Sequence, residues 1–338
     1  MKLKFKEKLK LKLKRFRSGY YFKDKSVFVV MYYILNIKTI FRELNTFLSG
    51  KNMHLYEPNG DLVVLRRNIH RLEKGLIMKP QKPVFALDYI DETVAIFSKL
   101  SLERGFSSKS ECEWAESVLF NYFNTVKLND ELQVHKNALD EKFSISDSGK
   151  GPFIRDFSSN KMTYENLYEF VKFRRSTRWF EPKAVPRELV DKAMILASES
   201  PSACNRQPYR YHFFDDKKLV QDVSSIAGGT AGFHHNFPMI AAVIGQQRAY
   251  FDERDRHVIY IDGALSAMSF VYGLESLGLS SCIINWPEVE DREAKMSQQL
   301  ELDKDERVIM LIAIGWPDKT AKVPYSHKKS LSVLRKFN

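Results

Sequence analysis

The sequence predicts a layered α+β fold from about residue 161 onward, preceded by a mostly helical N-terminal region. After Met162, amphipathic helices alternate with short apolar strands, which is typical of α/β or α+β layering. Residues 262–277 are apolar on nearly every side, so they predict a helix buried in the core. Between residues 26 and 150 only helical periodicity is present. With 338 residues, of which 44% are hydrophobic, the chain can fill one large domain or two ordinary ones.

The first half of the chain divides into a basic tail, residues 1–25, and a helical extension, residues 26–150. Ser110 followed by Glu113 matches a capping box and marks the start of one helix. Residues 144–159 are rich in Ser, Gly and Asp, so we place the boundary with the second domain, residues 161–338, in this stretch. Apolar periodicity predicts helices over residues 26–48, 61–73, 87–100 and 110–126.

The positive charge of the chain is concentrated in its first 17 residues. They carry nine Lys or Arg against one Glu, a local charge of +8 that leaves only +3 of the net +11 for the remaining 321 residues. We therefore expect no specific nucleic-acid partner, since such binding needs basic residues spread over a folded face. Leu and Phe alternate with Lys in this tail. Two interpretations stay open, namely attachment to an anionic membrane surface through residues 1–17 or a solvated tail.

Cysteine and histidine usage argues against a metal site. Cys112, Cys204 and Cys282 are widely spaced and odd in number, which suggests neither a disulfide framework nor a zinc site. His234 and His235 are adjacent, unlike the i, i+4 pair of a helical metal site. We expect no metal and a reducing, cytoplasmic location, with peripheral attachment at the inner face of the membrane if the tail binds lipid.

Two polar clusters in the second half carry the candidate chemistry. Residues 174–178 hold three arginines and two hydroxyls, and a guanidinium fork suits phosphate oxygens. Alone, these arginines could simply complement the dipole at the end of a helix. Residues 201–208 lie between two prolines, so they form a loop, and they offer a hydroxyl and two amides as donors. Together the clusters favour a site for a phosphate and an electron-rich ring.

These motifs, in this order, resemble the FMN-dependent nitroreductase family. Four successive segments resemble the N-terminal part of the family's domain. They are Arg-Arg-Ser-x-Arg-x-Phe from Arg174, a helix over residues 187–198, Pro-Ser-x-x-Asn-x-Gln-Pro from Pro201, and a strand over residues 209–214. Residues 238–245 resemble its central strand, residues 262–279 its core helix, and residues 312–317 its last core strand. The resemblance covers residues 161–338 and implies an α/β/α layered fold; nothing comparable is found for residues 1–160.

The resemblance implies FMN as cofactor and a set of residues that bind it. In the first motif these are Arg174, Arg175, Ser176 and Arg178, with Arg178 as the electrostatic tuner of the flavin near its N1 atom. The second motif is expected to contact the flavin of a partner subunit through Pro201, Ser202, Ala203, Asn205 and Gln207. After the core helix, a backbone N–H approaching flavin N5 is expected within Cys282, Ile283, Ile284 and Asn285.

The end of the chain departs from the family pattern. The family usually closes its phosphate site with an arginine, whereas this chain has His327, Lys328 and Lys329. Lysine holds a phosphate as a point charge without the bidentate fork. We assign Lys328 to the phosphate and expect weaker retention of the cofactor.

The function that the resemblance implies is an NAD(P)H oxidoreductase acting as a homodimer. Hydride would pass from NAD(P)H through FMN to an aromatic, nitro or quinone-like acceptor by a ping-pong mechanism. No protein side chain is assigned as catalytic, because the flavin carries the chemistry. The alternative is a non-catalytic, flavin-binding dimeric scaffold recruited through the basic tail and the helical extension.

Overall fold

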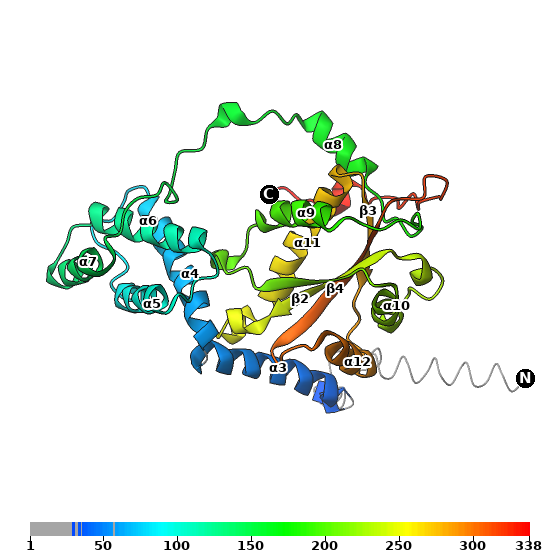
Figure 1. The fold of residues 1–338 in the computed structure, drawn as a ribbon, viewed down its shortest axis with the longest axis horizontal. Helices are drawn as coiled ribbons and strands as arrows, with labels where there is room; N and C mark the ends of the chain where they lie inside the picture. Colours follow the sequence, from blue (N-terminus) through cyan, green and yellow to red (C-terminus); the bar gives the residue numbers. More distant parts are fainter. Residues whose placement is uncertain (1–28, 31–32, 35, 57) are drawn as a thin grey trace, which may run out of the picture.

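The protein is described from a computed structural model that covers residues 29–30, 33–34, 36–56 and 58–338. The basic tail lies outside the described residues, so both interpretations of it stay predictions. Figure 1 shows a helical region on the left and a sheet-containing body on the right. A long segment arches over the top between them and carries the short helices η1 (Phe157–Ser159) and α8 (Tyr164–Phe173).

The body is built on one antiparallel sheet of four strands in the order β1-β2-β4-β3. The central strands β2 and β4 are buried along almost their whole length, which explains their nearly continuous apolar sequences. Three of the four strands were predicted, although β4 begins six residues earlier than residue 312, and β3 was not assigned as a strand. The strands are β1 (Tyr209–Phe214), β2 (Met239–Gln246), β3 (Ser280–Asn285) and β4 (Glu306–Gly315).

Helices cover both faces of the sheet, which confirms the α/β/α layering. On β2, Ala241 and Val243 pack toward α9 (Arg187–Ser198) and α11 (Val258–Ser276). The alternate residues, Ile240 and Ala242, pack toward the helices of the other face, α10 (Lys217–Ile226) and α12 (Glu290–Leu300). This period of two follows from the pleat of the strand. Sequence reasoning gave α9 at its observed bounds and placed α11, but it missed α10 and α12.

Within one chain, α11 is not covered on every side, which agrees with the expectation that one domain alone cannot cover an all-round apolar helix. Ile261 and Leu265 are 57% and 44% exposed, and Ile195 of the neighbouring α9 is 67% exposed. The opposite side of α11 is closely packed, since a Cβ on Gly273 would lie 2.9 Å from the Cα of Ala193. The stretch Glu253–Ser276 is long and apolar enough to cross a membrane by length and composition, but α11 packs against the sheet as a core helix.

Four helices of the extension share a hydrophobic core of their own, in which Leu65, Phe97 and Leu119 are almost completely buried. They are α4 (Pro58–Leu76), α5 (Ile90–Glu103), α6 (Lys109–Thr125) and α7 (Asp130–Phe143), the last of which was not predicted. Before them comes α3 (Ile37–Tyr56), which runs eight residues beyond the predicted end at residue 48, while residues 26–28 of that prediction lie outside the described chain.

Helix α3 lies along the sheet-containing body and joins it to the extension (Figure 1). A Cβ on Gly50 would lie 2.6 Å from the carbonyl carbon of Gln247, so only glycine permits this approach. One turn further on, His54 Nδ1 lies 2.8 Å from the carbonyl oxygen of Arg248. Near the start of α3, Arg42 pairs with Glu288 and Glu290.

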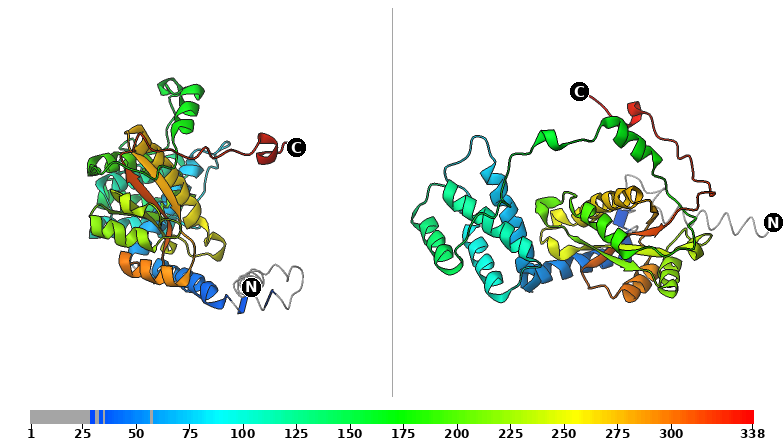
Figure 2. Two further views of the ribbon diagram at one scale, coloured as in Figure 1. Left: turned by 90° about the vertical axis from the view of Figure 1, so that its right-hand side faces the viewer. Right: turned by 45° about the horizontal axis from the view of Figure 1, so that its top comes forward.

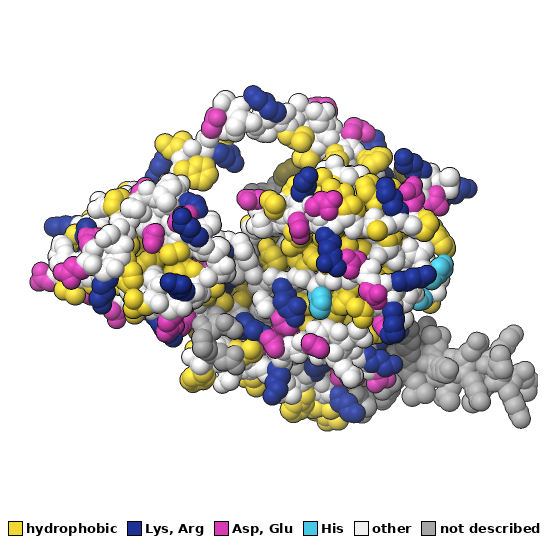
Figure 3. Space-filling view, in the orientation of Figure 1, with side chains coloured by type: hydrophobic (Ala, Val, Ile, Leu, Met, Phe, Trp, Pro, Cys, Tyr) yellow, Lys and Arg dark blue, Asp and Glu magenta, His cyan; other side chains and the backbone are white. Residues whose placement is uncertain are grey.

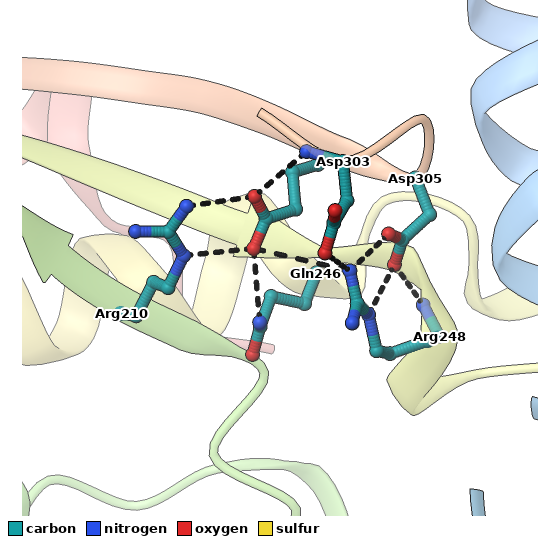
Figure 4. Close-up of polar contacts among 6 residues, drawn as sticks. Arg210, Gln246, Arg248, Asp303 and Asp305 are labelled. Atoms are coloured by element: carbon teal, nitrogen blue, oxygen red, sulfur yellow. Dashed lines mark hydrogen bonds and ion pairs between the residues drawn. The ribbon is translucent and has the colours of Figure 1, made fainter. Parts of the chain in front are cut away.

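A network of charged side chains closes the end of the sheet where α3 docks (Figure 4). Arg210 of β1 holds Glu306 with two hydrogen bonds of 2.8 Å, and the Gln246 amide donates to Glu306 at 3.0 Å. Arg248 binds the fully buried Asp305 through its side chain and through its backbone N–H, and its guanidinium reaches Asp303 at 2.6 Å. Buried carboxylates are thus each matched by an arginine.

The network predicts a loss of stability in acid. Burial opposes ionisation of Glu306, but the hydrogen bonds from Arg210 and Gln246 outweigh it and hold the pKa of Glu306 below its usual value. Its contribution to stability is therefore complete above the unfolded pKa of about 4.3 and is lost as the pH falls through the lower folded pKa. We expect Glu306→Gln to be less stable than the wild type at pH 7 and the gap to narrow below about pH 4. Urea unfolding midpoints measured from pH 7 to pH 3 test this, and a gap that does not change with pH would contradict it.

Candidate functional site

The first motif extends the sheet beyond its last strand. Thr163 caps α8 by accepting from the backbone N–H of Asn166, and the helix ends at Phe173. The chain then turns extended, and Ser176 forms an isolated parallel bridge with Ser281 of β3. Thr177 N–H donates to Ser281 O at 3.0 Å. This pairing places the arginines of the motif beside the start of β3, where the sequence-predicted Cys282 lies.

Three residues of the first motif and Lys328 line a single pocket of about 520 Å³. Its walls come from the end of α8, from Tyr272 near the end of α11 and from the segment after the last strand. The donor set suits a phosphate, because guanidinium, ammonium and hydroxyl groups all donate to phosphate oxygens. The pocket is lined by Tyr168, Val171, Lys172, Arg174, Arg175, Ser176, Tyr272, Pro324, Tyr325, Ser326, His327 and Lys328.

Of the basic side chains that line this pocket, Lys172 pairs with Glu169 at 3.2 Å, whereas three others have no such partner among the described residues. In the part of the chain that the structure describes, Arg174, Arg175 and Lys328 form no ion pair with a carboxylate, and Arg175 donates instead to the carbonyl oxygens of Lys172 and Arg174. Arg178 lies 5.7 Å from the ring centre of Phe233 and donates to Ser176 O at 3.3 Å. Burial raises the pKa of the Cys282 thiol, although Arg178 and Arg174 oppose the rise. The region is therefore positively charged, with a neutral thiol beneath it.

The second motif forms a loop at the other end of α11. Ala203 N–H donates to the buried Asp262 Oδ2 at 3.0 Å, and Gln207 N–H donates to Ser202 Oγ at 3.0 Å. Asp262 lies in the first turns of α11 and Tyr272 near its end. Ten residues of α-helix span about 15 Å. Within one chain, Pro201, Ser202, Ala203, Asn205 and Gln207 are therefore set well apart from the arginine pocket.

The third predicted segment lies in β3, at the edge of the sheet. Cys282 and Ile284 point into the core, whereas Ile283 is 40% exposed and Asn285 is exposed as well. The sequence analysis missed the three tyrosines of the pocket, which are Tyr168 and Tyr272 on helices and Tyr325 on the C-terminal segment. The signal of the two on helices is weak, because a tyrosine on an amphipathic helix is more often part of the packing than of a ligand site.

No group of three or more His, Cys, Asp or Glu side chains that could hold a metal ion occurs among the residues that the structure describes. His234 and His235 have ring centres 6.4 Å apart and inclined by 73°. His234 Nδ1 lies 3.1 Å from the carbonyl oxygen of Thr230, which fits a structural role.

The model of the nitroreductase family matches the C-terminal part of the chain, over residues 171–231 and 220–316. These matches contain the first and second motifs, all four strands and the core helix α11.

Two curated relatives match about half of the chain at low identity. An iodotyrosine deiodinase of Danio rerio is 21% identical over 196 residues, which is 50% of this chain and 65% of that protein. An iodotyrosine deiodinase of Thermotoga neapolitana is 24% identical over 175 residues, 45% of this chain and 89% of that protein. This chain thus spans slightly less than two thirds of the Danio rerio relative. Among solved structures, an FMN-dependent nitroreductase from Clostridium difficile aligns with a TM-score of 0.41 at 24% identity, covering 46% of this chain and 91% of that one.

Proposed function

We propose that the protein is an FMN-dependent NAD(P)H oxidoreductase of the nitroreductase type. The observation that carries the proposal is the pocket in which Arg174, Arg175 and Lys328 converge without carboxylate partners among the described residues. A phosphate group would supply the missing negative charge and accept from these donors and from Ser176. Arg178, on the same extended segment, is the cation assigned to the ring end of the cofactor.

The proposed division of labour leaves the redox chemistry to the cofactor. FMN supplies hydride transfer when bound. The residues of the chain hold it: the arginine pocket binds the phosphate, and Arg178 offers a fixed positive charge to the pyrimidine edge. Cys282, Ile283, Ile284 and Asn285 present the backbone of an edge strand. Ping-pong kinetics with an aromatic, nitro or quinone-like acceptor are expected, because donor and acceptor would use one face of the ring in turn.

The site requires a second copy of the chain. The two flavin motifs lie at opposite ends of α11 in one copy, so a pairing of two copies would bring the second motif of one to the arginine pocket of the other. Apolar side chains suited to such an interface are exposed on the arch and the C-terminal segment, which project from the body (Figures 2 and 3). They include Ile154 at 97% exposure, Phe173 at 74% and Phe337 at 76%. Ile261 and Leu265 add to this surface from α11.

We therefore predict an obligate homodimer that holds two flavins. Placing a charge in the exposed stripe of α11, as in Leu265→Glu, is expected to abolish dimer formation and FMN retention together, because the charge would be desolvated in the interface. Sedimentation and the ratio of FMN to protein measure the two properties. A monomeric wild-type protein that carries FMN would contradict the prediction.

The test of the proposed function is the visible spectrum of the purified protein, recorded before and after addition of NADH or NADPH under anaerobic conditions. We expect a yellow protein whose flavin absorbance is bleached by one of the two nucleotides and restored by a quinone or nitroaromatic acceptor. A protein that takes up no FMN would overturn the proposal. FMN binding without reduction by either nucleotide would support the non-catalytic scaffold instead.

A second candidate activity is reductive deiodination of an iodotyrosine. It is favoured by the relatives that carry this name and match the flavin domain, including those of Danio rerio and Thermotoga neapolitana. Release of iodide from iodotyrosine by the chemically reduced protein tests it. The cytoplasmic location and the attachment of residues 1–17 to an anionic membrane remain predictions, and sedimentation with anionic vesicles tests the latter.

A further inference from the structure

The loop of the second motif has an unusual backbone. Cys204, Asn205 and Gln207 have φ angles of 54°, 52° and 50°, in the left-handed region. Asparagine tolerates this region, but cysteine and glutamine rarely adopt it. Such a conformation persists only where its surroundings determine it, and it is often found where a loop presents groups to a ligand. The contacts that hold this loop therefore bear on its function.

From inside the body, the loop is held by α11 and by the chain before it. Asp262 accepts from Ala203 N–H and, at 2.7 Å, from the hydroxyl of Tyr250. The guanidinium of Arg206, which is buried, lies 4.6 Å from the ring centre of Tyr250. These contacts fix the first half of the loop and the side chain of Arg206. They do not reach the carbonyl group of Asn205.

The helical extension supplies that contact. Arg66 of α4 donates from Nε to the carbonyl oxygen of Asn205 at 3.1 Å, across 139 residues of sequence. Its Nη1 is paired with Glu111 of α6, and its guanidinium lies 5.5 Å from the ring centre of Trp114. Only 17% of the Arg66 side chain and 6% of the Glu111 side chain is exposed. Arg66 is thus a single buried bridge between two helices of the extension and the loop.

We propose that Arg66 is a positioning residue for the candidate flavin site, through which the helical extension holds the 202–207 loop in its left-handed conformation. This inference rests on the proposed function, because the value of the loop lies in presenting Ser202, Ala203, Asn205 and Gln207 to FMN. The helical extension then contributes directly to the geometry of the candidate site, through Arg66. Its sequence gave no indication of this, since Arg66 is one of several basic residues on α4.

The test compares two double variants in the full-length protein. Arg66→Met with Glu111→Gln removes the bridge to Asn205 without leaving a buried charge unpaired. Arg71→Met with Asp88→Asn is the matched control, because Arg71 also belongs to α4, pairs with Asp88 at 3.2 Å and stacks on Tyr89 at 3.5 Å. Among the described residues, Arg71 forms no hydrogen bond or ion pair with the loop. Two quantities are measured: hydrogen exchange of a peptide covering residues 200–208 in the apoprotein, and the Kd for FMN by fluorescence quenching.

In the Arg66 double variant, we expect hydrogen exchange in that peptide to be faster and the Kd for FMN to rise at least about tenfold. A tenfold rise corresponds to a loss of about 1.4 kcal/mol of binding free energy. The control should change neither quantity. Arg66→Lys keeps a cation beside Glu111 but not the fork that serves both partners, so it should recover thermal stability more than FMN affinity.

Unchanged exchange in the loop would overturn the proposal, and so would faster exchange with an unchanged Kd. If the wild-type protein itself takes up no FMN, the proposed function fails. The exchange measurement still distinguishes a failure of the proposed function from a failure of the role proposed for Arg66. Faster exchange in the Arg66 variant but not in the control supports the role of Arg66 in holding the loop, and equal exchange in both variants rejects it.

Discussion

An Arg174→Ala variant is expected to bind FMN about 10 to 150 times more weakly than the wild type, a loss of about 1.5–3 kcal/mol. The reason is the loss of charge-assisted hydrogen bonds to the phosphate in a pocket where Arg174, Arg175 and Lys328 form no ion pair among the described residues. Because Arg174 is partly exposed and makes no ion pair there, its removal should leave the fold intact. Titration of the apoprotein with FMN, followed by fluorescence quenching, gives the Kd.

The control is Arg187→Ala, since Arg187 is a surface arginine of the same domain that pairs with Asp215 and does not line the pocket. Its FMN affinity should match the wild type. Lys328→Arg is expected to change the affinity for FMN in the opposite direction. A guanidinium fork at this position should tighten binding if Lys328 contacts the phosphate. Equal affinity in the wild type, Arg174→Ala and Lys328→Arg would show that the phosphate does not bind in this pocket.

An Arg248→Ala variant is expected to lose about 3–5 kcal/mol of folding free energy, because it leaves the buried Asp305 carboxylate without its cation. The side chain of Asp305 is completely buried, and that of Arg248 is 12% exposed. Figure 4 shows how the guanidinium fork spans Asp303 and Asp305 at the end of the sheet. The carbonyl oxygen of Arg248 also meets His54, so docking of α3 should weaken as well. Urea unfolding followed by circular dichroism measures the loss.

The double variant Arg248→Met with Asp305→Asn distinguishes the loss of stability caused by an unpaired buried charge from the loss caused by poorer packing. It removes both charges, so we expect it to recover much of the stability lost in Arg248→Ala. Arg187→Ala, which breaks only an exposed pair, should unfold at nearly the wild-type urea concentration. If Arg248→Ala unfolds no earlier than Arg187→Ala, the network does not support the fold in the way its geometry indicates.

Local sequence signals were sufficient for most of the elements of the body. The predicted strands β1, β2 and β4 contain runs of apolar residues, and α8 and α9 have clear amphipathic patterns, with Thr163 as the cap of α8. In contrast, α10, α12 and α7 were missed. Helix α12 is strongly polar, with Glu290, Asp291 and Glu293 in its first turn, and only Met296 and Leu300 of its side chains are buried. So narrow an apolar contact leaves little periodicity in the sequence.

For the candidate site, the sequence was likewise sufficient to find each of the two motifs but not to show how they lie relative to each other. The arginines and the proline-bracketed loop could be found in the sequence because each motif is contiguous. Whether they meet depends on packing, and in one chain they do not, since α11 separates them. The family resemblance suggested Lys328 for the phosphate, and the structure places it on the wall of the arginine pocket, where its role stays a prediction.

What the sequence by itself determined is therefore most of the elements, the resemblance to the nitroreductase family and the residues of each motif, because these depend on neighbours along the chain. Only the tertiary structure decided which distant residues touch. The approach of α3 to the body at Gly50 and the bridge from Arg66 to Asn205 join segments that are far apart in sequence. The exposure of Ile261 and Leu265 on α11 likewise depends on which distant segments pack around that helix. Such contacts arise from the burial of faces against one another, and periodicity along one segment reports that a face is buried without reporting its partner.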